Sequence, residues 1–261
     1  MGLNCGIVGL PNVGKSTIFS ALTAAPAEVA NYPFCTIDPN VGIVSVPDPR
    51  LDKIVALIPP AKVVPATFEF VDIAGLVAGA SKGEGLGNRF LASIREVGVI
   101  AHVVRCFDDN DIIHVNNKID PAGDIETINI ELALADLDTV TNRWAKQAKL
   151  TRLSKEAQKE NEKVLPVLSR LKECLEDGKS ARSLKLEEDE LAMVSDLHLI
   201  TLKPVIYVCN VDEDGIVQEN EYVKTVRAIA EAEGSEVVVI CGKIESEIAV
   251  LETEEEKREF L

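Results

Sequence analysis

Short apolar runs alternate with longer amphipathic stretches in the first half of the chain. Apolar runs of strand length lie at 4–9, 41–46, 66–72 and 98–107, and helical patterns follow at about 15–24 and 87–96. Alternation of this kind is typical of a parallel sheet that carries helices on its faces. We therefore predict an α/β fold for this half.

The pattern becomes helical after about residue 125 and stays so until about residue 200. Val164, Leu168, Leu171 and Leu175 step by four, three and four residues, which is the spacing of a buried helix stripe. Because a similar stripe precedes them, we expect two long helices that form an antiparallel coiled-coil hairpin.

Strand patterns return at 204–209 and 237–240, with a helix at about 220–233 between them. We therefore predict three parts: a first sheet segment at 1–125, a helical insertion at 126–199 and a second sheet segment at 200–261. The last residues still follow a helical pattern, so we expect the natural protein to be longer.

Composition narrows the fold and the compartment. Aromatic residues make up only 4% of the 261 residues, so we expect an aliphatic core. The six cysteines show neither a Cys-x-x-Cys pair nor metal-ligand spacing, which favours free thiols in a reducing compartment. The sequence shows no signal peptide and no apolar run long enough to span a membrane, so we expect a cytoplasmic protein without membrane association. We also expect a monomer.

The first chemical motif is a glycine loop between the first predicted strand and the first predicted helix. Gly9, Gly14, Lys15 and Ser16 form the pattern Gly-x-x-x-x-Gly-Lys-Ser. Backbone N–H groups of such a loop converge on phosphate oxygens, the lysine reaches the β- and γ-phosphates, and the serine hydroxyl binds Mg²⁺. The sequence therefore predicts a P-loop nucleotide site. We expect Asn12, Val13 and Thr17 to contact the nucleotide as well.

A second motif, Asp-Ile-Ala-Gly at 72–75, ends a predicted strand 57 residues after Lys15. An Asp at this place can hold the Mg²⁺ shell, and the Gly75 N–H can contact the γ-phosphate. Thr36 follows Ser16 by 20 residues, where a loop can bring a hydroxyl onto the metal in the triphosphate state. We predict Ser16, Thr36 and Asp72 as Mg²⁺ ligands.

Two segments compete for the base-reading role that Asn-Lys-x-Asp has in GTPases. Residues 117–120 match that pattern, but they follow the 98–107 strand too closely to leave room for a crossover helix and a further strand. The alternative, Asn-Val-Asp-Glu at 210–213, follows a predicted buried strand and replaces the pattern's Lys by Val211 and its Asp by Glu. Loss of the Asp geometry removes the preference for guanine, so we favour ATP and keep a GTPase as the alternative. Asn210, Val211, Cys241 and Gly242 are the predicted base contacts.

At this point a family resemblance is clear. The motifs at 9–17, 31–36, 72–91 and 210–213 resemble those of the YchF group of Obg-like ATPases, and the resemblance covers the helical insertion too. It implies a P-loop nucleoside triphosphatase fold with a doubly wound, mostly parallel sheet, ATP and ADP as ligands, and association with ribosomes. It also implies a C-terminal TGS domain, which this sequence lacks.

Hydrolysis is expected to be slow, because Leu76 stands where Ras-like proteins have the Gln that orients the attacking water. His114, in a polar loop after the 98–107 strand, is our candidate for positioning that water, with Lys15 and Gly75 stabilising charge. A K⁺ ion bound through Asn12 is the alternative. A nucleotide-gated binding module with incidental hydrolysis remains the alternative function.

Charge is unevenly distributed. The chain has a net charge of −16, yet residues 143–182 carry eleven Lys and Arg against six Asp and Glu. Basic residues recur every three or four positions, at Arg143, Lys146, Lys149, Arg152, Lys155, Lys159 and Lys163. We expect most of them to share one side of a helix and to contact ribosomal RNA. The alternative is a solvated helix face.

Overall fold

The computed structural model describes residues 3–24, 41–73, 86–109, 111–112, 118–150 and 155–251, with residues 253 and 256. A six-stranded sheet has the order β2-β3-β1-β4-β5-β6. The strands are β1 (Leu3–Val8), β2 (Val41–Ser45), β3 (Thr67–Asp72), β4 (Val99–Arg105), β5 (Val205–Asn210) and β6 (Glu236–Ile240). Only β2 runs antiparallel to its neighbour, so the predicted α/β fold with a mostly parallel sheet is confirmed.

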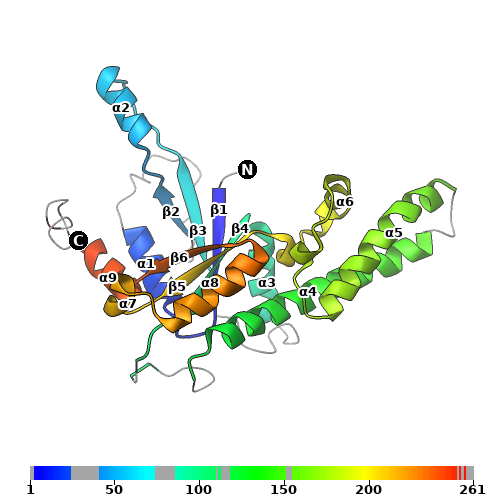
Figure 1. Ribbon diagram of the computed structural model, residues 1–261. Coiled ribbons are helices and arrows are strands. Elements are labelled where there is room, and N and C mark those ends of the chain that lie inside the picture. Colours follow the sequence, from blue (N-terminus) through cyan, green and yellow to red (C-terminus); the bar gives the residue numbers. More distant parts are fainter. Residues whose placement is uncertain are drawn as a thin grey trace.

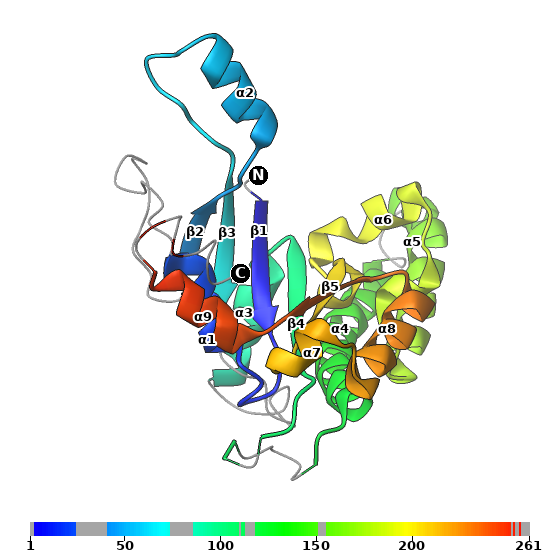
Figure 2. The ribbon, with the colours of Figure 1, turned by 60° about the vertical axis from the view of Figure 1, so that its left-hand side comes forward.

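Helices cover both faces of the sheet (Figure 1). They are α1 (Lys15–Ala24), α2 (Pro49–Leu57), α3 (Leu86–Glu96), α4 (Pro121–Leu150), α5 (Lys155–Glu176), α6 (Glu188–Val194), α7 (Glu213–Val217), α8 (Glu221–Glu233) and α9 (Gly242–Ala249). In Figure 2, α1 and α9 lie on one side of the sheet and α4 and α8 on the other. β4 and the second half of β1 are buried on both faces, and both are apolar along most of their length.

The carboxyl ends of β1, β3, β4 and β5 meet at one edge of the sheet. β1 lies between β3 and β4, so the loop after Val8 is flanked by Asp72 on one side and by the end of β4 on the other. Arg105 pairs in register with Asn210, which brings the end of β5 to the same edge. Ligands of doubly wound sheets bind at this edge.

The helical insertion is an arm made of α4 and α5, which run side by side in opposite directions (Figure 1). Val140 of α4 and Val164, Leu168 and Leu171 of α5 belong to its hydrophobic cluster. The first half of α4 instead joins the cluster under the sheet, through residues such as Ile128. The predicted helical hairpin is therefore present. The division of the chain into parts at 1–125, 126–199 and 200–261, and the coiled-coil character of the hairpin, stay predictions.

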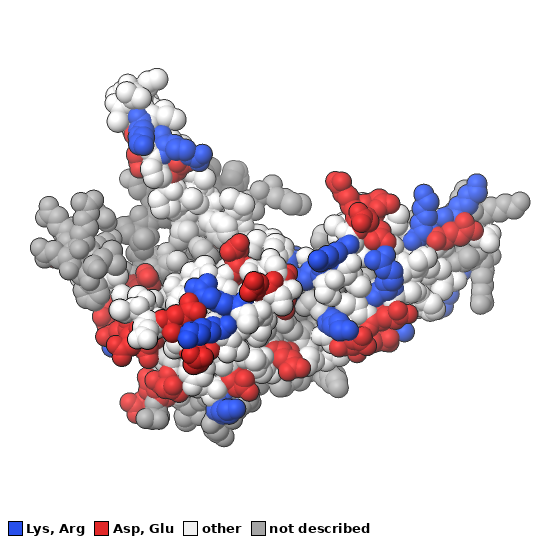
Figure 3. All heavy atoms as spheres, in the orientation of Figure 1, with Lys and Arg blue, Asp and Glu red and all other residues white. Residues whose placement is uncertain are grey.

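The predicted basic stripe does not lie on a single helix. α4 ends at Leu150 and α5 begins at Lys155, so the stripe is divided between two antiparallel helices. Lys146, Lys149, Lys159 and Lys163 are exposed, and Arg143 pairs with Asp196 at 2.8 Å. In Figure 3 basic and acidic side chains are mixed along the arm, while acidic ones dominate near α7 and α9.

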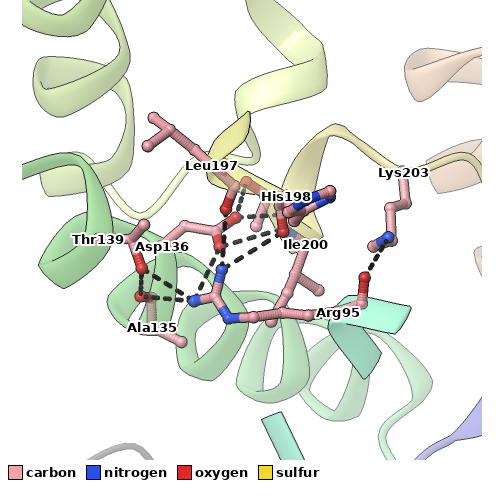
Figure 4. Close-up of polar contacts among 9 residues, drawn as sticks. Arg95, Ala135, Asp136, Thr139, Leu197, His198, Ile200 and Lys203 are labelled. Atoms are coloured by element: carbon pink, nitrogen blue, oxygen red, sulfur yellow. Dashed lines mark hydrogen bonds and ion pairs between the residues drawn. The ribbon is translucent and has the colours of Figure 1, made fainter. Parts of the chain in front are cut away.

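A buried polar cluster fixes the base of the arm to the sheet domain (Figure 4). Asp136 of α4 is fully buried and accepts hydrogen bonds from Ile200 N at 3.0 Å and from Thr201 N and Thr201 Oγ1, both at 2.7 Å. Arg95, in the last turn of α3, lies 3.6 Å from the Asp136 carboxylate and donates to Thr139 Oγ1 at 2.9 Å. The cluster therefore joins α3, α4 and the segment that returns to β5.

Sequence reasoning missed α2, which projects from the body between β2 and β3 (Figures 1 and 2). None of its residues is buried, so it has no core-facing stripe to detect. Local signals were nonetheless present: Asp48 caps the helix by accepting from Arg50 N, and Pro49 opens it.

The described residues include most of the cysteines and the helices of the protein. Five cysteines there are free and buried, as predicted, and Cys35 lies outside them. In the same part of the chain, no helix combines the length and the apolar character that a membrane crossing requires.

Candidate functional site

The loop between β1 and α1 has the backbone of a phosphate-binding loop. Gly14 has φ +96°, and a Cβ there would lie 2.2 Å from Asn210 Nδ2. Only glycine fits this position, because both the backbone angle and the close approach exclude a side chain. Asn12 has φ +61°, a left-handed conformation that Asn tolerates better than most residues. Thr17 and Ser16 are exposed at the start of α1, and Val13 is buried beneath the loop.

Lys15 lies folded across this loop. Its side chain is buried, and its Nζ donates to the Leu10 carbonyl at 2.7 Å. Burial lowers the pKa of Lys15, and the negative charge of Asp72 partly opposes that effect. An ammonium held inside a glycine loop beside a helix N-terminus is arranged to bind an anion.

Ser16 and Asp72 provide a place for a divalent cation. Ser16 Oγ donates to Asp72 Oδ2 at 3.4 Å, a long contact, and Asp72 Oδ1 is buried without a hydrogen-bond partner among the described residues. A buried carboxylate oxygen left unpaired is costly unless a ligand completes it. Oxygen donors of this kind suit Mg²⁺, so the residues present fit the predicted metal. Within the described ranges no cluster of three or more His, Cys, Asp and Glu side chains offers another site.

A cavity of about 750 Å³ opens beside the loop. Its lining includes Asn12, Gly14 and Thr17, residues 107–109, residues 210–214 and residues 241–243. The phosphate loop and the predicted base contacts Asn210, Val211, Cys241 and Gly242 therefore share one cavity, which is large enough for a small organic ligand.

Asn210 joins the three segments of this cavity. Its Nδ2 donates to Val13 O at 2.9 Å, and its Oδ1 accepts from Gly242 N at 2.9 Å. Val211 N donates to Ile240 O at 2.9 Å, which fixes the segment after β5 to the end of β6. Asn210 is thus a buried tether between loops, a role that its prediction as a base contact did not include.

Asp212 and Glu213, the two carboxylates within the Asn-Val-Asp-Glu motif, are each engaged by a neighbouring group. Asp212 Oδ1 caps α7 by accepting from Gly215 N at 2.8 Å. Glu213 Oε1 accepts from Lys243 Nζ at 2.8 Å, and this ammonium lowers the pKa of Glu213. The sequence placed Lys243 in the loop with the predicted base contacts Cys241 and Gly242, but it gave no sign that the Lys243 side chain pairs with Glu213.

The structure brings most of the predicted site residues to one edge of the sheet, while three fall outside the described residues. Those three are Thr36, Gly75 and His114. Asn117 is outside as well, but Asp120 is described and accepts from Gly123 N at 3.2 Å at the start of α4. This capping contact agrees with the interpretation of residues 117–120 as something other than a base reader.

Both the sequence and the fold of the chain are similar to those of known proteins. Residues 4–163 match a family described as "50S ribosome-binding GTPase". The ribosome-binding ATPase YchF of Bacillus subtilis (strain 168) is 57% identical over 265 residues, which cover all of this chain and 71% of that protein. The protein of the same name from Escherichia coli O157:H7 is 52% identical over 264 residues, covering 100% and 70%.

A solved structure, that of the Schizosaccharomyces pombe YchF GTPase, superimposes with a TM-score of 0.84 at 37% identity. The match covers 99% of this chain and 70% of that one, so it includes the helical arm as well as the sheet. With sequence similarity over the whole length and the same fold around a phosphate-binding loop, the chain belongs to the YchF family of P-loop proteins.

Proposed function

We propose that this protein is a Mg²⁺-dependent nucleotide switch that slowly hydrolyses ATP to ADP and phosphate and associates with the ribosome. The observation that carries the proposal is the glycine loop with buried Lys15 beside the unpaired Asp72 oxygen. Support for ATP and for the ribosome comes from relatives named ribosome-binding ATPases.

In phosphoryl transfer, each of the predicted site residues would contact either the phosphates or the metal. Lys15 and the loop N–H groups neutralise the β- and γ-phosphates, and Ser16 and Asp72 hold Mg²⁺, with Thr36 as a further ligand in the triphosphate state. The metal supplies positive charge where negative charge develops on the transferred phosphoryl group. Gly75 contributes a backbone N–H to the γ-phosphate.

His114 is our proposed water-positioning residue, because Leu76 has no polar atom that could serve. A K⁺ ion held with the help of Asn12 is the alternative source of catalytic charge. Single-turnover hydrolysis by His114→Ala separates the two: a lower rate with unchanged ATP affinity favours His114. An unchanged rate that falls when Na⁺ replaces K⁺ favours the ion.

A GTPase is the second candidate, because the matched family description and the Schizosaccharomyces pombe relative carry that name. Equilibrium affinities for Mg·ATP and Mg·GTP, measured side by side, decide between them. We expect ATP to bind more tightly and Lys15→Ala to lose tight binding of both triphosphates, since the phosphate charge is then unpaired. Equal affinities in the parent protein would exclude the ATP preference, and tight binding by Lys15→Ala would exclude the loop assignment.

A further inference from the structure

An ion pair spans the two loops on the base side of the cavity. Glu213 opens α7 and Lys243 lies in the first turn of α9, 30 residues later in the chain. Lys243 Nζ and Glu213 Oε1 are 2.8 Å apart, and both side chains line the cavity that contains Gly14 and Asn210. The pair therefore lies where the two loops approach a ligand.

The chemistry of the two purines gives this contact a consequence. Guanine presents two adjacent donors, N1–H and the 2-amino group, and a carboxylate recognises them by accepting one hydrogen bond on each oxygen. Adenine has neither donor, so its binding free energy does not depend on whether the carboxylate oxygens are available. Discrimination against guanine is therefore greater when no carboxylate near the base has two oxygens available.

Each of the two carboxylates in residues 210–213 already has one oxygen engaged. Asp212 uses Oδ1 to cap α7, and Glu213 uses Oε1 to pair with Lys243. The pair is exposed, with side chains 62% and 69% accessible, and an isolated pair of that kind contributes little to stability. A base that enters the cavity displaces water from it, and the same charges then interact more strongly.

We propose that Lys243 is a specificity-determining residue, which weakens guanine binding by holding one oxygen of Glu213. This inference rests on the proposed nucleotide function and adds to it. The sequence attributed the loss of guanine preference to the replacement of the guanine-reading Asp by the longer Glu213, and Lys243 adds a second cause that acts on the same carboxylate.

The test uses the whole chain and compares dissociation constants for Mg·ATP and Mg·GTP in each variant. In Lys243→Ala both Glu213 oxygens become available, so the ratio of the GTP constant to the ATP constant should fall on the order of tenfold, the scale of one hydrogen bond to a charged group. Lys243→Arg keeps a cation at this place and should keep the parent ratio.

Two further variants make the result specific. Lys224→Ala removes a similar exposed pair, Lys224 Nζ to Glu221 Oε1 at 2.7 Å on α8, and should leave the ratio unchanged. In a Glu213→Gln background, Lys243→Ala should have no further effect on the ratio, because the group that Lys243 holds is gone.

The outcomes distinguish this inference from the function on which it rests. A parent protein that binds ATP, with an unchanged ratio in Lys243→Ala, overturns the role of Lys243 alone. An equal fall in Lys224→Ala, or a full effect in the Glu213→Gln background, also overturns it. A parent protein that binds neither nucleotide overturns the proposed function and this inference together.

Discussion

His102 is a titratable residue inside the sheet. It is buried in β4, and its ring centroid lies 5.5 Å from that of Tyr207 in β5. Burial, followed by the positive charges of Arg182 and Lys15, lowers the pKa of His102 to about 3. The folded protein therefore holds a neutral imidazole at this position.

This difference in pKa predicts a pH dependence of stability. The unfolded chain takes up a proton at His102 near pH 6.5, whereas the folded protein does not until about pH 3. The stability that neutral His102 provides is therefore complete above pH 6.5 and decreases as the pH falls from there toward 3. Between pH 7.5 and 5.5 the parent should lose about 1.4 kcal/mol more unfolding free energy than His102→Gln. Urea titrations at the two pH values measure this, and equal losses would contradict it.

At the scale of elements, the contacts of Asp136 hold the arm to the sheet domain (Figure 4). Burial raises the pKa of Asp136, and its bonds to Thr201 and Ile200, with the nearby Arg95, oppose that effect. Asp136→Ala leaves three buried donors without an acceptor and should cost about 3–5 kcal/mol of unfolding free energy. Asp196→Ala removes a half-exposed partner of Arg143 and should cost less than about 1 kcal/mol. Similar losses in the two variants, measured by urea denaturation, would show that the cluster does not hold the arm.

Local patterns explain which elements the sequence could predict. The strands are continuous apolar runs and the arm has a repeating stripe, so each can be recognised from neighbouring residues alone. α2 buries nothing, and its two capping signals are short. Asp136 and Thr201 are 65 residues apart, and no local pattern says that a buried carboxylate will meet those particular N–H groups.

The same distinction holds for the candidate site. Phosphate-loop glycines are predictable because the backbone conformation that they permit is local. Asn210 bonds to Val13, which is 197 positions away in the sequence, and to Gly242, which is 32 positions away. These contacts depend on the order of the strands in the sheet, which the sequence leaves open. Lys243 and Glu213 meet for the same reason, since α7 and α9 follow adjacent strands.

At the scale of the whole molecule, a net charge of −16 repels nucleic acid, so any contact with ribosomal RNA must be local. The exposed lysines of the arm, among them Lys146 and Lys149, are our proposed contact. Changing these two to Glu should weaken ribosome binding and lower the slope of log affinity against log salt by about 1 per lost phosphate contact. The ATP affinity of this arm variant should stay at the parent value. As a control, changing Lys53 and Lys62 to Glu, outside the arm, should leave ribosome binding at the parent value. Sedimentation with ribosomes across a salt series measures this; parent affinity and slope in the arm variant would exclude the arm as the RNA-binding surface.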